Sequence, residues 1–340
     1  AGFGRATSIE ATRRGHEAVA TARDITTLTD LDVAQRLDLD VTDQASIDSA
    51  MAEAGTVDAL VNNAGVDRHG PVEAYPEDVA RWIMDTNFWG TFRMTCAVAP
   101  AMREQGSGVI VNMSSVQGRV GTPLGGIYSA SKAAIESYSE SAHFELGHFG
   151  IRLVIMQPGY FDTPMAAKGS NELVDGTEYE ALAEQWSSGS DSLNPAGRPG
   201  PEPVATAIVD AIENGETPLR VPVGDDAHLV LGARSAMDDS EFEDVMRSTL
   251  NLYWEDRVRS STTGCATRGD HRSPFLGSPP RPNRSVNDGG NNMGSTAGEG
   301  FNLEVLPPWA RPLKTVERAR DLLKIVTDIV THRYEAPMVD

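Results

Sequence analysis

Short apolar runs alternate with helical stretches through the first 258 residues of the chain. The runs that we predict to be strands are 17–22, 36–39, 58–61, 108–113, 151–156 and 219–223. Apolar residues at helical spacing predict helices at 43–54, 76–105, 127–149, 204–213 and 238–253. A further helical stretch precedes the first strand and ends at Arg14-Gly15, where the glycine stops a helix. Because strands and helices alternate, neighbouring strands must run parallel, with helices on both faces of the sheet. The pattern therefore predicts a doubly wound α/β fold.

The acidic excess belongs to this first part of the chain. Residues 1–258 hold 40 acidic and 18 basic residues, whereas residues 259–340 hold 9 and 11. A surface this negative repels phosphate backbones, so we expect no nucleic-acid partner. No stretch approaches the roughly 18 consecutive apolar residues of a membrane span, so we expect no membrane partner either.

The two cysteines, Cys96 and Cys265, lie far apart in the sequence. They cannot form a disulfide framework or a metal site by themselves, so we expect no metal. The first residues also lack the apolar segment of a signal peptide. These features predict a cytoplasmic protein.

The composition changes after residue 258. Of the 42 residues in 259–300, 18 are Gly, Pro or Ser, and such a segment buries too little apolar surface to offset its ordering entropy. We therefore predict a disordered linker there. In the last part of the chain, helical spacing of apolar residues predicts one amphipathic helix over 315–333. The predicted division is a domain, a linker and a C-terminal segment, at 1–258, 259–300 and 301–340.

Tyr128 and Lys132 lie four residues apart in a predicted helix and so share one of its faces. An ammonium beside a phenol favours the anionic form and lowers the pKa of the phenol. The pair is therefore a candidate for acid/base chemistry near neutral pH, although the same spacing also occurs in solvated helix pairs.

Polar side chains follow two of the predicted strands. Ser115 comes directly after the strand 108–113, where the crevice of an α/β fold binds ligands. Asn62 and Gly65 belong to the run Asn-Asn-Ala-Gly that follows the strand 58–61, and such residues allow a tight turn and a close backbone approach. Asn87 stands inside a predicted helix, where asparagine is unfavourable. Each of these residues also has a purely structural interpretation.

The order and spacing of these motifs resemble the short-chain dehydrogenase/reductase family, over residue 1 to about residue 254. The motifs that carry the resemblance are Gly2-Phe-Gly4, Asp40-Val41, Asn62-Asn63-Ala64-Gly65, Asn87, Ser115, Tyr128-x-x-x-Lys132 and Pro158-Gly159. The resemblance implies a Rossmann-type fold and an oxidoreductase that interconverts an alcohol and a ketone or aldehyde. It also implies a nicotinamide dinucleotide cofactor.

The resemblance also implies a role for each matching residue. Tyr128 is the expected acid/base at the substrate oxygen, and Lys132 is expected to lower its pKa and to bind the nicotinamide ribose. Ser115 is expected to stabilise charge on the substrate oxygen, and Asn87 to hold a water that links Lys132 to solvent. The other expected cofactor contacts are Gly2, Gly4, Asp40, Asn62, Gly65, Pro158, Gly159 and Thr163.

The end of the second strand of the family fold determines the choice between NADP and NAD. Here that strand ends at Ala22, and Arg23 follows. An arginine can bind a 2′-phosphate through two hydrogen bonds, so we predict a preference for NADP(H), with NAD(H) as the second possibility. If the strand ran two residues further, Asp24 could bind the ribose and reverse this preference.

The substrate is less well defined by the sequence. Tyr160, Phe161 and Met165 follow the Pro-Gly motif, where the family places its substrate pocket, and they predict a small apolar carbonyl compound or alcohol. The same residues could equally belong to the core. Members of the family are often dimers or tetramers, so we expect a homo-oligomer.

The sequence departs from the family at one point, because the family's first strand and first glycine are absent before Gly2. In the family this strand is central, so we expect an N-terminally truncated fold with a divided sheet. Residues 301–306 alternate apolar and polar side chains, but we do not expect them to replace a central parallel strand. Two functions therefore remain: the oxidoreductase, and a non-catalytic fragment or dinucleotide-fold binding protein.

Overall fold

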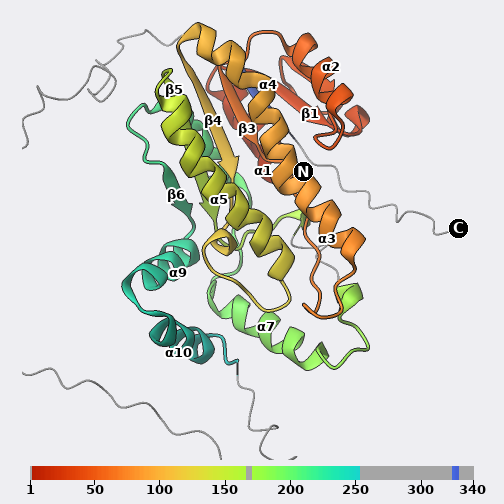
Figure 1. The fold of residues 1–340 in the computed structure, drawn as a ribbon, viewed down its shortest axis with the longest axis vertical. Coiled ribbons are helices and arrows are strands. Elements are labelled where there is room, and N and C mark those ends of the chain that lie inside the picture. The colour runs from red at the N-terminus through yellow and green to blue at the C-terminus, as the bar shows by residue number, and fades with distance from the viewer. Residues whose placement is uncertain (1, 166–170, 253–323, 329–340) are drawn as a thin grey trace, which may run out of the picture. The chain divides into compact units, whose positions relative to one another are not determined.

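Seven parallel strands form one sheet in the order β2-β1-β7-β3-β4-β5-β6 (Figure 1). The strands are β1 (Glu17–Ala22), β2 (Gln35–Asp38), β3 (Ala59–Asn62), β4 (Gly108–Met113), β5 (Ile151–Pro158), β6 (Arg220–Val223) and β7 (Lys324–Asp328). The computed structural model describes residues 2–165, 171–252 and 324–328. This arrangement confirms the predicted Rossmann-type α/β fold.

Helices cover both faces of the sheet (Figure 1). They are α1 (Gly2–Arg13), α2 (Gln44–Ala54), α3 (Glu77–Met84), α4 (Gly90–Gln105), α5 (Gly126–Gly147), α7 (Glu180–Ser192), α8 (Glu202–Glu213), α9 (Asp225–Ala236) and α10 (Asp239–Thr249). Side chains of α2, α4 and α5 pack into one apolar core against the sheet. Those of α1 and α8 pack into a second core on the other face.

The predicted helix over 315–333 is wrong for the residues that the structure describes there. Residues 324–328 form β7, which lies between β1 and β3. Ile325, Val326 and Thr327 are β-branched and favour extended backbone, and each position gains ladder partners on both sides. The stabilisation from pairing with β1 and β3 outweighs the helix preference that the spacing of apolar residues suggested. The rest of the predicted helix, the linker 259–300 and the run 301–306 lie outside the described residues.

β7 completes the sheet that the sequence led us to expect divided. Its register aligns Val326 with Val19 of β1 and with Leu60 of β3. Ile325 and Val326 are fully buried and point into opposite cores, as alternation along a strand requires. The expectation of a divided sheet is therefore wrong, because a strand from late in the sequence occupies the central place.

The structure adds two helices that the sequence analysis missed. α7 lies in a segment rich in Gly, Ser and Glu, and α9 starts directly after β6. Local capping explains other boundaries: the Asp238 carboxylate accepts a hydrogen bond from the Glu241 N–H and so starts α10. Within the described residues, none of the helices combines the length and the apolar composition of a membrane span.

We predict that Val326→Asp destabilises the whole fold, because it places an unpaired charge in the core beneath β7. The expected loss is about 3–5 kcal/mol of unfolding free energy. Chemical denaturation measures it. Val72→Asp makes the same chemical change at a side chain that is 86% exposed, and it should leave the stability nearly unchanged. Equal stability of the two variants would show that β7 is not in the central position.

Candidate active site

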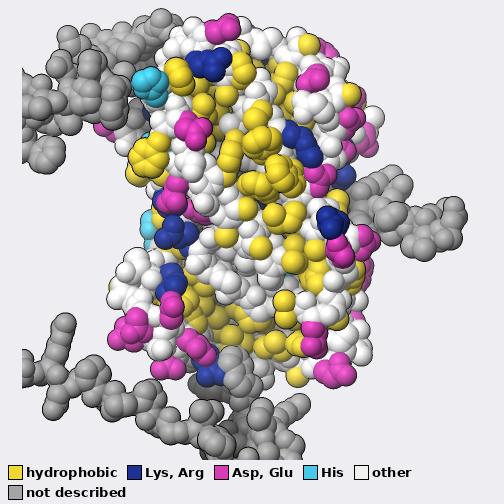
Figure 2. Space-filling model, in the orientation of Figure 1, with side chains coloured by type: hydrophobic (Ala, Val, Ile, Leu, Met, Phe, Trp, Pro, Cys, Tyr) yellow, Lys and Arg dark blue, Asp and Glu magenta, His cyan; other side chains and the backbone are white. Residues whose placement is uncertain are grey.

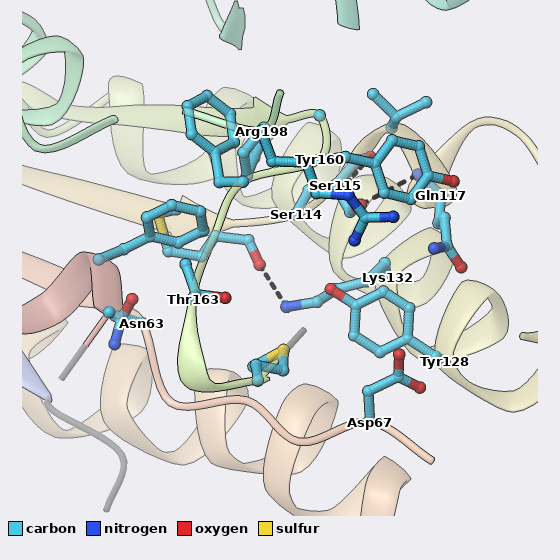
Figure 3. Close-up of a pocket in the computed structure, with 18 of the residues that line it drawn as sticks. Asn63, Asp67, Ser114, Ser115, Gln117, Tyr128, Lys132, Tyr160, Thr163 and Arg198 are labelled. Atoms are coloured by element: carbon cyan, nitrogen blue, oxygen red, sulfur yellow. Dashed lines mark hydrogen bonds between the residues drawn. The ribbon is translucent and has the colours of Figure 1, made fainter. Parts of the chain in front are cut away.

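One pocket opens at the carboxyl ends of the central strands. The predicted site residues that line it are Gly2, Ser115, Tyr128, Lys132, Pro158, Gly159, Tyr160, Phe161, Thr163 and Met165. Figure 3 shows that Ser115, Tyr128 and Lys132 approach one another inside it. The parallel fold explains this convergence, because the segments that follow β4 and β5 leave the sheet at the same edge.

Helix α5 carries both members of the Tyr-Lys pair, and both side chains are buried. The Lys132 Nζ donates a hydrogen bond to the carbonyl of Met113, at 2.7 Å, and so reaches the end of β4. The same Nζ lies 5.6 Å from the centre of the Tyr128 ring. The helix therefore presents a phenol and an ammonium side by side to the pocket.

The pKa of Tyr128 shifts in the direction opposite to the one that the sequence predicted. Burial raises the pKa of this phenol, and the negative charge of Asp67 raises it further. A hydrogen bond with Ser115 acts against both and lowers the pKa. The Tyr-Lys spacing gave no sign of this, because it reveals neither the depth of burial nor a carboxylate from another loop.

Ser115 occupies the first turn after β4. Its hydroxyl accepts a hydrogen bond from the N–H of Gln117, at 3.1 Å, and so caps a short 3-10 turn, Val116–Gly118. This bond holds the hydroxyl at the carboxyl end of β4, where it also forms a hydrogen bond with Tyr128. A hydroxyl held in this way can donate its proton to an oxygen in the pocket.

Asn87 lies in a π-helical turn, Asp85–Trp89, between α3 and α4. Its Nδ2 donates to the Val66 carbonyl and to the Ser131 hydroxyl, each at 2.9 Å, and its Oδ1 accepts from the Val66 N–H. The amide thus ties the loop after β3 to the helix that carries Tyr128. The wide turn explains how an asparagine fits into an otherwise continuous helix.

Asn62 and Gly65 lie on the loop that follows β3. The Asn62 Nδ2 donates to Asn112 Oδ1 of β4, at 2.8 Å, so this side chain joins two strands inside the protein. A Cβ at Gly65 would lie 3.6 Å from the Lys132 Nζ, so the backbone passes directly beside the pocket. Asn62 is thus part of the scaffold, and Gly65 is near the reacting groups.

The start of α1 borders the same pocket. Gly2 has a φ of +70°, which favours glycine, and it faces the segment at Thr163. Gly4 is buried in the first turn, and the Phe3 ring packs edge-on against Phe161 at 5.5 Å. N–H groups at a helix start attract anionic groups, so the start of α1 offers backbone donors beside the pocket.

The remaining predicted contacts lie away from the pocket. Arg23 is exposed and follows the end of β1 at Ala22, as predicted. Asp24 instead caps a 3-10 turn by accepting a hydrogen bond from the Thr26 N–H, at 3.0 Å. The Asp40 carboxylate accepts hydrogen bonds from the N–H and the hydroxyl of Thr42 and so stabilises the turn after β2.

The family model for short chain dehydrogenases matches residues 1–173, just over half of the chain. This chain belongs to the short chain dehydrogenase family.

Curated relatives and solved structures agree with this membership. A 3-ketodihydrosphingosine reductase of Bacteroides thetaiotaomicron is 33% identical over 229 residues, covering 66% of this chain and 84% of its own. Bovine retinol dehydrogenase 8 is 32% identical over 284 residues, with coverages of 77% and 89%. A short-chain dehydrogenase structure from Streptomyces avermitilis is 37% identical, covers 73% of this chain and 95% of its own, and has a TM-score of 0.59. These matches support oxidoreductase activity.

Within this short chain dehydrogenase, Asp226 is a buried residue that sequence reasoning missed. Its carboxylate accepts hydrogen bonds from the Tyr160 N–H, at 2.6 Å, and from Asn194. A Cβ at Gly159 would lie 2.2 Å from an Asp226 oxygen, so only glycine fits there. Asp226 therefore sets the path of the chain after β5 and with it the positions of Tyr160 and Phe161.

The pocket also contains polar side chains that the sequence did not single out. They are Asp67, His69, Gln117 and Arg198. Asp67 and His69 belong to the loop after β3 and follow the Asn-Asn-Ala-Gly run within four residues. Their closeness in sequence to this run could have marked them as pocket residues. Arg198 gave none, because it comes from a loop between α7 and α8 whose course depends on tertiary packing.

Proposed function

We propose that the chain is an NADP(H)-dependent oxidoreductase that interconverts an alcohol and a ketone or aldehyde, with Tyr128 as the acid/base. The observation that carries this proposal is the convergence of the buried groups Ser115, Tyr128 and Lys132 on one pocket beside the start of α1. Each comes from a place where the family fold positions reacting groups. Residues 1–258, with β7 added to the sheet, form the proposed catalytic domain.

In the direction of reduction, the Tyr128 hydroxyl gives its proton to the substrate oxygen. The Ser115 hydroxyl donates a hydrogen bond to the same oxygen and stabilises its developing charge. A bound nicotinamide dinucleotide supplies the hydride. The raised pKa of Tyr128 keeps the phenol protonated before the reaction, and the positive charge of Lys132 stabilises the phenolate that remains. Asn87 holds the Lys132 helix and, in this proposal, supports a water link to solvent.

The preference for NADP(H) follows from the end of β1. The strand stops at Ala22, the exposed Arg23 follows it directly and Asp24 caps a turn, and these features support Arg23 as the proposed ligand of a 2′-phosphate. A short chain dehydrogenase from Burkholderia cenocepacia, 26% identical with a TM-score of 0.57, was solved in complex with NADP. The other proposed cofactor contacts are Gly2, Gly4, Gly65, Pro158, Gly159 and Thr163. Asp40 and Asn62 are also proposed as contacts, although their side chains already hold the turn after β2 and join β3 to β4.

An apolar substrate fits the other wall of the pocket. Tyr160, Phe161 and Met165 line it, although Phe161 also belongs to an apolar core. The names of the relatives, a 3-ketodihydrosphingosine reductase and a retinol dehydrogenase, describe enzymes of carbonyl compounds and alcohols. The alternative, a non-catalytic fragment or binding protein, was motivated by the missing first strand and by the long C-terminal tail. β7 occupies the central place in the sheet, which weakens the first of these reasons, and most of the tail lies outside the described residues.

A homo-oligomer through α4 and α5 is part of the proposal. Aromatic rings from the π-helical turn, α4 and α5 form one cluster through edge-on and tilted contacts: Phe88, Trp89, Phe92 and Tyr138. Trp89 is 45% exposed. Figure 2 shows hydrophobic side chains gathered in the middle of the face on which α4 and α5 run in Figure 1. A contiguous apolar patch of this kind marks a contact surface.

We expect Tyr128→Phe to lower turnover by about a hundred- to ten-thousandfold, the usual contribution of general acid/base catalysis. The absorbance of the reduced nicotinamide measures turnover, and calorimetry should find NADPH binding unchanged. Tyr138→Phe is the matched control, because it makes the same change on the same helix but in the aromatic cluster. Retained activity in Tyr128→Phe would refute the assignment.

We expect Arg23→Ala to lower kcat/KM with NADPH roughly tenfold to a hundredfold, the value of a charge-assisted hydrogen bond, and to leave the NADH value nearly unchanged. Steady-state kinetics with both cofactors measures the split. Arg81→Ala, at an arginine that is 77% exposed on α3, serves as the control. A wild-type preference for NADH would contradict the role of Arg23.

We expect sedimentation velocity to give a mass of at least two chains for the wild type and of one chain for Trp89→Arg. The reason is that a charge in the apolar patch opposes its burial. Ile9→Arg, on α1 at the other face of the sheet, should keep the wild-type mass. A monomeric wild type would exclude this interface.

A further inference from the structure

Asp67 is a half-buried carboxylate in the pocket that the proposed reaction does not use. It lies on the loop after β3 and lines the pocket together with Tyr128 and Lys132. Figure 3 shows its carboxylate beside the Tyr128 ring. The side chain is only 13% exposed. Its Oδ1 is buried and has no hydrogen-bond partner within the part of the chain that the structure describes.

The negative charge of Asp67 acts on the inside of the pocket. It raises the pKa of Tyr128 and of Tyr160, both of which line the pocket, and the pKa of the neighbouring Tyr75. These phenols belong to three different segments of the chain. The carboxylate therefore lies close to the place where a substrate must bind if Tyr128 is the acid/base.

Three cationic side chains line the pocket. His69 contacts only one oxygen of the Asp67 carboxylate, and Arg198 and Lys132 bind other groups. His69 Nε2 lies 3.5 Å from Oδ2 of Asp67, which raises the pKa of His69, but Oδ1 is not engaged. Arg198 forms an ion pair with Asp191 at 2.7 Å and lies over the Tyr160 ring. Lys132 donates to the Met113 carbonyl.

A structural role does not account for the free oxygen. Buried carboxylates in protein cores normally have both oxygens hydrogen-bonded, because an unpartnered buried acceptor is costly. Glu136 shows the satisfied case in this protein, because its Oε1 accepts from the Gln157 amide and its Oε2 from the Arg220 guanidinium. In Asp67, the unpartnered atom belongs to a side chain that lines the pocket, so a bound molecule can supply the missing donor.

We propose that Asp67 determines substrate specificity by accepting a hydrogen bond from a hydroxyl or a protonated amine that the substrate carries near its reacting carbonyl. This inference rests on the proposed oxidoreductase function. It narrows the substrate class from apolar carbonyl compounds to hydroxy ketones or amino ketones with an apolar chain.

Three ketones on the same alkyl chain test this: a methyl ketone, its hydroxymethyl analogue and its aminomethyl analogue. We expect wild-type kcat/KM for a donor-bearing ketone to exceed that of the methyl ketone roughly tenfold to a hundredfold, as a hydrogen bond to a charged group allows. Asp67→Ala should remove this preference, so that the ratio of kcat/KM for the donor-bearing ketone to that for the methyl ketone falls to about one.

A second variant distinguishes the two donors. Asp67→Asn keeps an acceptor oxygen but loses the charge, so it should retain part of a preference for the hydroxy ketone and lose a preference for the amino ketone. Asp48→Asn makes the same change at an exposed site on α2 and should leave all three rates at their wild-type values. Far-UV circular dichroism checks that each variant is folded.

The possible outcomes separate this inference from the function on which it rests. Turnover of all three ketones by the wild type at equal kcat/KM, or an equal loss on all three in Asp67→Ala, overturns the role of Asp67 and leaves the oxidoreductase standing. Turnover of none of them, with any cofactor, counts against the proposed function, and the inference falls with it.

Discussion

The position of α5 against the sheet is fixed by buried amide side chains, and every group at the pocket depends on it. Asn112 of β4 accepts from Asn62 of β3 and donates to Ser139 of α5, each at 2.8 Å. Asn87 reaches the same helix through Ser131. In a low-dielectric interior such bonds are directional and costly to break, so α5 cannot slide or turn without leaving polar groups unpaired. Tyr128 and Lys132 take their places from this constraint.

The same interior that fixes Tyr128 also sets its chemistry. Burial and the nearby Asp67 charge favour the neutral phenol, while Ser115 and Lys132 favour the phenolate. An acid that must give its proton to a substrate benefits from being protonated until the substrate oxygen gains charge. The opposing influences come from two loops and one helix, so the proton affinity of Tyr128 is a property of the assembled pocket.

Much of this arrangement could be predicted from the sequence, and the exceptions have physical causes. Strand 108–113 was located to the residue, and the edge of the sheet that collects Ser115, Tyr128 and Lys132 follows from parallel topology alone. β7 could not be predicted, because its spacing suits a helix and only the gap between β1 and β3 selects a strand. Asp226 and Arg198 were missed for a related reason. They reach the site through contacts between segments far apart in the chain, Asp226 with the N–H of Tyr160 and Arg198 with the Tyr160 ring, which no local pattern records.

The central place of β7 also determines when the two halves of the sheet can join during synthesis, because β7 is made last of the seven strands. Glu17 pairs with Lys324, so more than three hundred residues separate the two neighbours in the sheet. At translation rates of about 5–20 residues per second, roughly 15 to 60 s pass between the emergence of β1 and that of its partner. Until β7 is made, the strand that pairs with both β1 and β3 in the folded protein is missing, and unpaired strand edges bind readily to other chains.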